Sequence, residues 1–186
     1  MIPTELTGSK FEEHTLTALE RIEKKELGTF GRYGVQAVHT GKEWQIMQSL
    51  PDFEGIFGTR QIIFDCKVCT QASFPWVKYR ESTGGPRSRQ LRHLRKRSRF
   101  GVVCGFLLHW NARELKTKAE PAVTFWLPVQ DSSPYWELVE QGEIKSLTRE
   151  DCRSMGVEVP WQIHDRDRNH KLALEWLFSQ LTTVLH

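Results

Sequence analysis

The segment that most constrains the fold covers residues 60–68, RQIIFDCKV, in which an acid and a lysine are embedded among apolar residues. β-Branched and aromatic residues favour a strand here, and successive side chains of a strand point to opposite faces. Asp65 and Lys67 therefore share one face of the strand. The opposite face carries Ile62, Phe64, Cys66 and Val68. Because the preceding residues are so apolar, we expect neither charge to be merely solvated.

Helical and strand patterns flank this segment on both sides. Ser9 can cap a helix over about 10–27, whose apolar arc contains Phe11, Thr15, Leu16, Ala18, Leu19 and Ile22. Strands are expected at 33–38, 44–50, 100–108 and 122–127, with a turn at 51–55 and an irregular loop at 69–85. Further helices are expected from Pro86 onward and at 134–141, 148–155 and about 169–185. This order predicts one α/β domain over residues 1–186, with a mixed central β-sheet flanked by helices and the C-terminal helix packed on it.

A second acid, Asp52, stands in the predicted turn before the strand and can approach Asp65. Hard divalent ions such as Mg²⁺ bind carboxylate oxygens and keep several water ligands. A cation held by Asp65 would share its cavity with Lys67 and could activate a water against a phosphorus atom. Glu12, at the edge of the apolar arc, can complete the cluster, whereas Glu13 points away. The alternative is an exposed ion pair between Asp65 and Lys67, worth at most about 1 kcal/mol.

Basic charge is concentrated in the helix that begins at Pro86. Lys and Arg number 26 against 23 Asp and Glu, yet residues 87–99 contain seven Lys or Arg and no acid. Leu91 and Leu94 lie on its packing side with Gln90 at the border, where Gln90 can reach the metal site or a phosphate. Arg95 belongs to the opposite, outward side. A DNA backbone is the candidate partner, contacted by Arg87, Arg89, Arg92, His93, Arg95, Lys96 and Arg99; a simply solvated helix face is the alternative.

Other classes of protein are disfavoured by the remaining patterns. Cys66 and Cys69 would face opposite sides of a continuing strand, which argues against a structural zinc site. Walker-type and Gly-x-Gly loops are absent, which argues against a nucleotide cofactor. The N-terminal sequence has no signal-peptide core, and the longest apolar run spans nine residues, whereas a membrane helix needs about 20. These features, with four scattered cysteines, predict a cytoplasmic protein that does not act at a membrane.

Two groups of motifs resemble a known nuclease family. Pro51-Asp52 followed by Asp65-Cys66-Lys67 resembles the PD-(D/E)-x-K nuclease signature. The longer run PDFEGIFGTRQIIFDCKVCTQASFPW, with Gln90 in RQLRHL and the run FGVVCGFLL, is similar to RecU-type Holliday-junction resolvases. GSKFEEHTL and IKSLTREDCRSMGVEVPW extend this likeness over most of residues 8–161.

The resemblance implies a Mg²⁺- or Mn²⁺-dependent endonuclease with a restriction-endonuclease-like core. Such enzymes are usually homodimers that hydrolyse phosphodiester bonds at four-way DNA junctions during recombination and repair. By position, the resemblance implies that Asp52 and Asp65 bind the metal together with the backbone carbonyl of Cys66. It also implies Lys67 as the catalytic lysine, Gln90 as the helix glutamine and Glu12 as the N-terminal acid, with Glu13 as the fallback.

Two departures from the family pattern leave other functions open. Those resolvases carry a long projection between the early strands, whereas only about a dozen residues around 39–47 are available here. The family's second acid is commonly Glu, and Asp65 is one methylene shorter. The alternatives are a nuclease of the same core that acts on duplex, flap or phage DNA, and a non-catalytic DNA-binding module.

Overall fold

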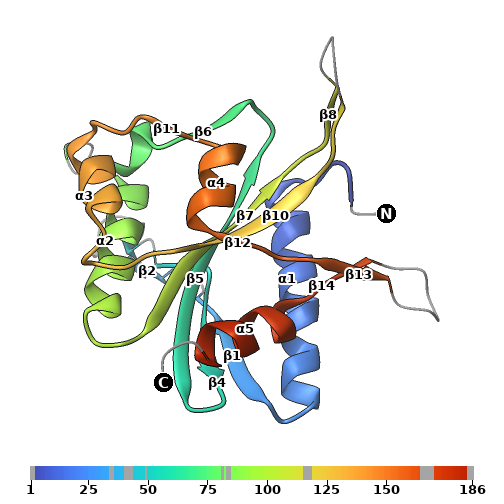
Figure 1. The fold of residues 1–186 in the computed structure, drawn as a ribbon. Helices are drawn as coiled ribbons and strands as arrows, with labels where there is room; N and C mark the ends of the chain where they lie inside the picture. Colours follow the sequence, from blue (N-terminus) through green and yellow to red (C-terminus); the bar gives the residue numbers. More distant parts are fainter. Residues whose placement is uncertain are drawn as a thin grey trace.

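A six-stranded mixed sheet forms the centre of the fold (Figure 1). The structure is a computed structural model that describes residues 3–33, 36–39, 44–48, 50–80, 82, 85–114, 119–163 and 170–183. The strands, in sheet order, are β1 (Gly28–Arg32), β4 (Phe53–Phe57), β5 (Arg60–Cys69), β7 (Val103–Trp110), β10 (Val123–Pro128) and β12 (Val157–Glu158). β5 pairs antiparallel with β4 and parallel with β7, which confirms the expected mixed sheet.

Helices cover both faces of this sheet (Figure 1). On one face lie α1 (Gly8–Lys24) and α5 (Leu174–Thr183). On the other lie α2 (Pro86–Ser98), α3 (Pro134–Gln141) and α4 (Arg149–Met155). The α/β class predicted from the sequence is therefore confirmed. The order of α1, the antiparallel strands β1, β4 and β5, α2, and then β7 parallel to β5 gives the expected restriction-endonuclease-like core.

The central strand β5 has two apolar faces because helices pack on both sides of it. Ile62, Phe64 and Cys66 join the core beneath α1 and α5, whereas Ile63 joins the core beneath α2, α3 and α4. The alternation expected for this strand is confirmed. It places the side chain of Asp65 on the α2 side of the sheet.

Four two-stranded sheets accompany the central sheet in the described part of the chain. They pair β2 (Gln36–His39) with β3 (Trp44–Gln48), β6 (Ser73–Pro75) with β11 (Ser146–Thr148), β8 (Arg113–Glu114) with β9 (Ala119–Glu120), and β13 (Trp161–Ile163) with β14 (His170–Leu172). β2 and β3 follow β1 and precede β4, and residues 40–43 between them lie outside the described residues. A short antiparallel strand pair therefore occupies the segment between β1 and β4.

Several predicted boundaries were wrong because contacts from distant segments outweigh local patterns. Phe53 to Gly55 are part of β4 rather than a turn, since Phe53 stacks on Phe64 with ring centroids 5.3 Å apart. Leu16, expected on the buried arc of α1, is 37% exposed. The C-terminal helix begins at Leu174 rather than 169, because residues 170–172 pair with β13.

Helix caps and turns account for other shifts. α1 begins at Gly8 because Thr7, rather than Ser9, accepts a hydrogen bond from the Lys10 amide. The loop at 69–85 is not wholly irregular, since it contains β6 and a 3₁₀ helix, η1 (Val77–Tyr79). The strand expected at 100–108 starts only at Val103, after Gly101 turns the chain with a φ of 76°. No helix within the described residues is both long and apolar enough to cross a membrane.

His109 on β7 is a neutral side chain buried between α1 and the start of β13. Its ring lies 5.3 Å from that of Phe11 and 5.8 Å from that of Trp161, and its Nδ1 is 2.8 Å from Thr124 Oγ1. Burial lowers the pKa of His109 to about 4. A histidine whose pKa is depressed on folding contributes stability that is complete above its unfolded pKa and is lost as the pH falls.

We predict that this histidine makes unfolding strongly pH-dependent. Between pH 7.5 and pH 4 the His109 contribution to the free energy of unfolding should fall by about 3 kcal/mol, because the unfolded chain takes up the proton first, near pH 6.5. Urea unfolding of the wild type and His109→Gln at both pH values measures the difference. An equal pH dependence in the two proteins would contradict the prediction.

Candidate active site

Asp65 lies at the middle of β5, enclosed between β4 and β7 and fully buried. Its Oδ1 accepts a hydrogen bond of 3.1 Å from Gln90 Nε2, and the same amide lies 3.2 Å from the Leu50 carbonyl oxygen. Gln90 is on α2, so helix and strand hold this carboxylate together. The structure thus places Gln90 in contact with the acid of β5.

The ammonium of Lys67 lies within a set of three oxygen atoms. It forms an ion pair with Asp65 Oδ2, donates to the Cys66 carbonyl oxygen at 3.0 Å, and lies 3.8 Å from Asp52 Oδ2. Burial would lower the pKa of Lys67, but the Asp65 carboxylate outweighs that effect and raises the pKa above its usual value. Lys67 is therefore a fixed positive charge at this position.

Asp52 approaches the site from the residue before β4. Its Oδ2 accepts the backbone N–H of Cys66 at 2.7 Å, and its backbone carbonyl accepts the N–H of Tyr33 at 3.0 Å. These two bonds connect the segment before β4 to β5 and to the end of β1. The structure thus brings Asp52, Asp65 and Lys67 together, as the sequence pattern predicted.

Glu12 approaches this group but does not join it. It is half-buried, and its carboxylate pairs with Arg32 at the end of β1. Burial and then the charge of Asp52 raise the pKa of Glu12. Glu13 is exposed, so Glu12 is the acid on the side of the site. Within the described residues, no three acidic, histidine or cysteine side chains converge closely enough to hold a metal ion.

The chemistry of Asp52, Asp65 and the Cys66 carbonyl nevertheless fits a hard divalent cation. Burial raises the pKa of Asp65, and the neighbouring Lys67 ammonium opposes that shift. Its Oδ2 has the Lys67 ion pair but no well-directed hydrogen bond. The Lys67 ammonium already lies near oxygen atoms of Asp52, Asp65 and the Cys66 carbonyl. Mg²⁺ sites typically combine one or two carboxylates with water.

Tyr79 is a residue of this site that sequence reasoning missed. It belongs to η1, its side chain is fully buried, and its hydroxyl has no hydrogen-bond partner among the described residues. Its ring packs against Phe106, which pairs with Asp65 in the sheet register. Burial raises the pKa of Tyr79, and the positive charge of Lys67 opposes that shift. The only sequence signal was an aromatic residue in a loop expected to be irregular.

The basic helix α2 is less available for DNA than its sequence indicates. Arg95 was expected to point outward, but it is 14% exposed and paired with Glu140 and Asp131. Arg99 also pairs with Asp131, at 2.6 Å. Both acids come from the region of α3, which packs beside α2, and local sequence gives no indication of them.

Three exposed basic residues remain along one side of α2: Arg89, Arg92 and Lys96. Their spacing of three and four residues aligns them on a helix surface. Arg89 and Lys96 have no hydrogen-bond or ion-pair partner within the described chain. Arg87 lies over the ring of Tyr79 at 5.8 Å, beside the candidate site. His93 is half-buried, and burial followed by the charge of Arg97 lowers its pKa.

Known proteins similar to this chain include a nuclease of DNA junctions. The structure of Archaeoglobus fulgidus Hjc, a Holliday junction resolvase from an archaeal hyperthermophile, matches with a TM-score of 0.48 and 16% sequence identity. That match covers 81% of this chain and 95% of the other. No curated protein matches the sequence.

The family comparison covers most of the chain and most of the candidate site. The sequence model of RecU, recombination protein U, matches residues 32–166. This span contains Asp52, Asp65, Lys67 and Gln90, whereas Glu12 precedes it. The chain therefore belongs to the recombination protein U family, a family of structure-selective DNA endonucleases that act in recombination.

Proposed function

We propose that this protein is a divalent-metal-dependent endonuclease that cuts four-way DNA junctions. Its active site is formed by Asp52, Asp65 and Lys67. The observation that carries the proposal is a fully buried carboxylate and an ammonium in contact on the central strand, with a second carboxylate oxygen 3.8 Å away. A buried ion pair contributes little net stability, so its presence favours a functional role. Family membership supplies the class of reaction.

The side chains of this site divide the work of phosphodiester hydrolysis. Asp65, Asp52 and the Cys66 carbonyl would hold Mg²⁺ or Mn²⁺, which would supply a water of lowered pKa and offset negative charge on the phosphate. Gln90 keeps Asp65 oriented through its Oδ1. Glu12 lies outside the group formed by Asp52, Asp65 and Lys67. It would contact the metal ion through a bound water rather than bind it directly.

Lys67 would stabilise charge on the reacting phosphate. Its ammonium now neutralises Asp65, and a bound cation would take over that neutralisation. Lys67 would then face the substrate as a free positive charge, and positive groups aimed at developing negative charge account for a large share of enzymatic rate enhancement. The buried Tyr79 hydroxyl is the neighbouring acceptor that can hold the ammonium in place.

The DNA backbone would lie along the exposed side of α2. Arg89, Arg92 and Lys96 are exposed on the helix whose buried side carries Gln90, the partner of Asp65. A homodimer would place two such sites on one symmetric junction and give paired cuts. The homodimer is proposed from the family resemblance.

A second candidate function is cleavage of other branched or linear DNA by the same site. The short β2–β3 hairpin favours it, because a long projection that could enter a junction is not available between β1 and β4. Cleavage of a four-way junction, a flap and a linear duplex at one salt concentration separates the two functions. A junction enzyme leaves the linear duplex intact.

We predict that Asp65→Asn reduces the cutting rate of a labelled four-way junction by about a thousandfold, because it removes a metal-binding carboxylate without removing the side chain's volume. Binding of the junction in EDTA should be retained. Glu13→Gln is the matched control and should cut normally. Unchanged cutting by Asp65→Asn would exclude the assigned site.

We predict that replacing Lys67 and replacing Asp65 change the affinity for metal in different directions. Lys67→Met should leave Mn²⁺ affinity unchanged or raised several-fold, since it removes a cation that competes for the same oxygens, while reducing cutting by about 10²–10⁴-fold. Asp65→Asn should weaken Mn²⁺ binding. Electron paramagnetic resonance titration measures both, and equal losses of affinity in the two variants would refute the shared position.

We predict that exposed and paired arginines of α2 behave differently. Arg89→Ala/Lys96→Ala should make the slope of log Kd against log salt shallower by about 0.9 for each DNA phosphate that is no longer neutralised. Arg95→Ala should leave that slope nearly unchanged and lower the free energy of unfolding by about 2 kcal/mol, because Glu140 is deprived of its partner. Equal changes of slope would contradict the distinction.

A further inference from the structure

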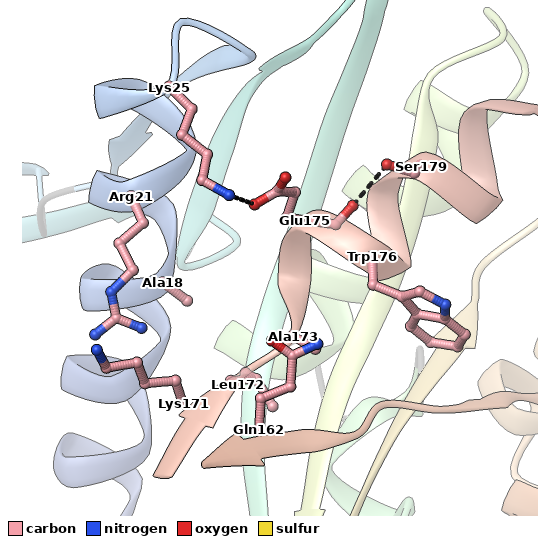
Figure 2. A pocket seen from close by; sticks show the side chains of 10 residues that line it. All are labelled: Ala18, Arg21, Lys25, Gln162, Lys171, Leu172, Ala173, Glu175, Trp176 and Ser179. Carbon is pink, nitrogen blue, oxygen red and sulfur yellow. Dashed lines mark hydrogen bonds and ion pairs between the residues drawn. The ribbon is translucent and has the colours of Figure 1, made fainter. Parts of the chain in front are cut away.

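A pocket lies on the α1–α5 side of the sheet, away from the candidate active site (Figure 2). It has a volume of about 460 Å³ and is formed by the second half of α1, the β13–β14 pair and the start of α5. Neither Asp52, Asp65, Lys67 nor Gln90 lines it. The pocket is therefore separate from the candidate active site.

The described residues that line this pocket carry a net positive charge. Arg21 and Lys25 enter from α1 and Lys171 from β14, and the single acid among the lining residues, Glu175, is paired with Lys25 at 2.6 Å. The Arg21 guanidinium has no hydrogen-bond or ion-pair partner in the part of the chain that the structure describes. Figure 2 shows the side chains of Arg21 and Lys171 reaching toward each other beside α1, with Lys171 coming from β14.

The opposite wall of the pocket is aromatic. Trp176, in the first turn of α5, is 40% exposed and is one of few large apolar side chains on the surface of the described residues. Gln162 from β13 lines the floor between the aromatic wall and the cationic wall (Figure 2). The Trp176 ring lies on the far side of Gln162 from Arg21 and Lys171 (Figure 2). This arrangement suits a strand of several nucleotides, because a phosphate can meet the cations while a base further along stacks on the ring.

We propose that this pocket binds a strand of DNA outside the cleavage site. A phosphate contacts Arg21 and Lys171, and a sugar or unpaired base further along the strand lies against Trp176. This inference rests on the proposed function, since it assigns the pocket to the same DNA substrate.

The position of the pocket indicates which part of the substrate it receives. Arg21 follows Glu12 by two and a half helical turns, so the two side chains leave α1 on opposite sides, about 13 Å apart along its axis. One straight strand does not readily follow both surfaces. A branched DNA, whose arms diverge, can place one arm at the active site and a neighbouring arm in the pocket.

Binding of a labelled four-way junction and of a linear duplex, in EDTA across a potassium chloride series, tests the proposal. Arg21→Ala/Lys171→Ala should weaken junction binding about tenfold and make the salt slope shallower by about 0.9 or more, with a smaller effect on the duplex. Lys24→Ala removes one charge from the same helix outside the pocket and is the matched control. Circular dichroism confirms that each variant is folded.

A second variant reports on the aromatic wall independently of charge. Trp176→Phe should remove part of the tryptophan quenching that junction binding produces, whereas quenching equal to that of the wild type would place the DNA elsewhere. At saturating junction, Arg21→Ala/Lys171→Ala should retain its kcat and show a raised KM, because the pocket holds substrate and takes no part in hydrolysis.

Failure of this inference is distinguishable from failure of the proposed function. Wild-type affinity and salt slope in Arg21→Ala/Lys171→Ala, with cutting still abolished by Asp65→Asn, would overturn the pocket and leave the nuclease intact. A change of oligomeric mass in sedimentation equilibrium, without a change of salt slope, would also overturn it and assign the pocket to a subunit contact. Absence of metal-dependent cutting by the wild type would instead refute the proposed function.

Discussion

The candidate active site depends on one ion pair, Asp65 with Lys67, that is kept inside the central sheet. Removing such charges from water costs several kcal/mol per ion, and mutual attraction compensates only when further polar groups complete the geometry. Gln90, the Cys66 carbonyl and Asp52 supply those groups from α2, from β5 and from the segment before β4. Three elements are therefore held in register by polar contacts at the site, while apolar packing fixes the rest of the sheet.

The sequence predicted the parts of this site that depend on short-range geometry. Alternation along β5 was sufficient to place Asp65 and Lys67 on one face. It could not predict groups that arrive from distant segments: Arg32 removes Glu12 from direct contact, and Glu140 with Asp131 neutralises Arg95. The pattern PDFEG at residues 51–55 predicts a turn, although packing of Phe53 on Phe64 makes Phe53 a strand residue.

Net charge describes this protein poorly, because positive groups are distributed over two separate surfaces. A formal charge of +3 conceals the exposed side of α2 on one side of the sheet and the Arg21 pocket on the other. On α2 the acids of the α3 region reduce an apparent run of seven cations to a narrower stripe. A substrate that meets both surfaces must pass around the edge of the sheet, and branched DNA satisfies that requirement.

The central claim is that a divalent cation can take the position that the Lys67 ammonium now occupies. Anomalous scattering from crystals soaked with Mn²⁺ tests it most directly, because the signal locates the metal without reference to activity. The account predicts a peak between the carboxylates of Asp52 and Asp65 and the Cys66 carbonyl, with Lys67 displaced toward Tyr79. A map with no peak at that position under saturating Mn²⁺, and with the Asp65–Lys67 contact intact, would contradict it.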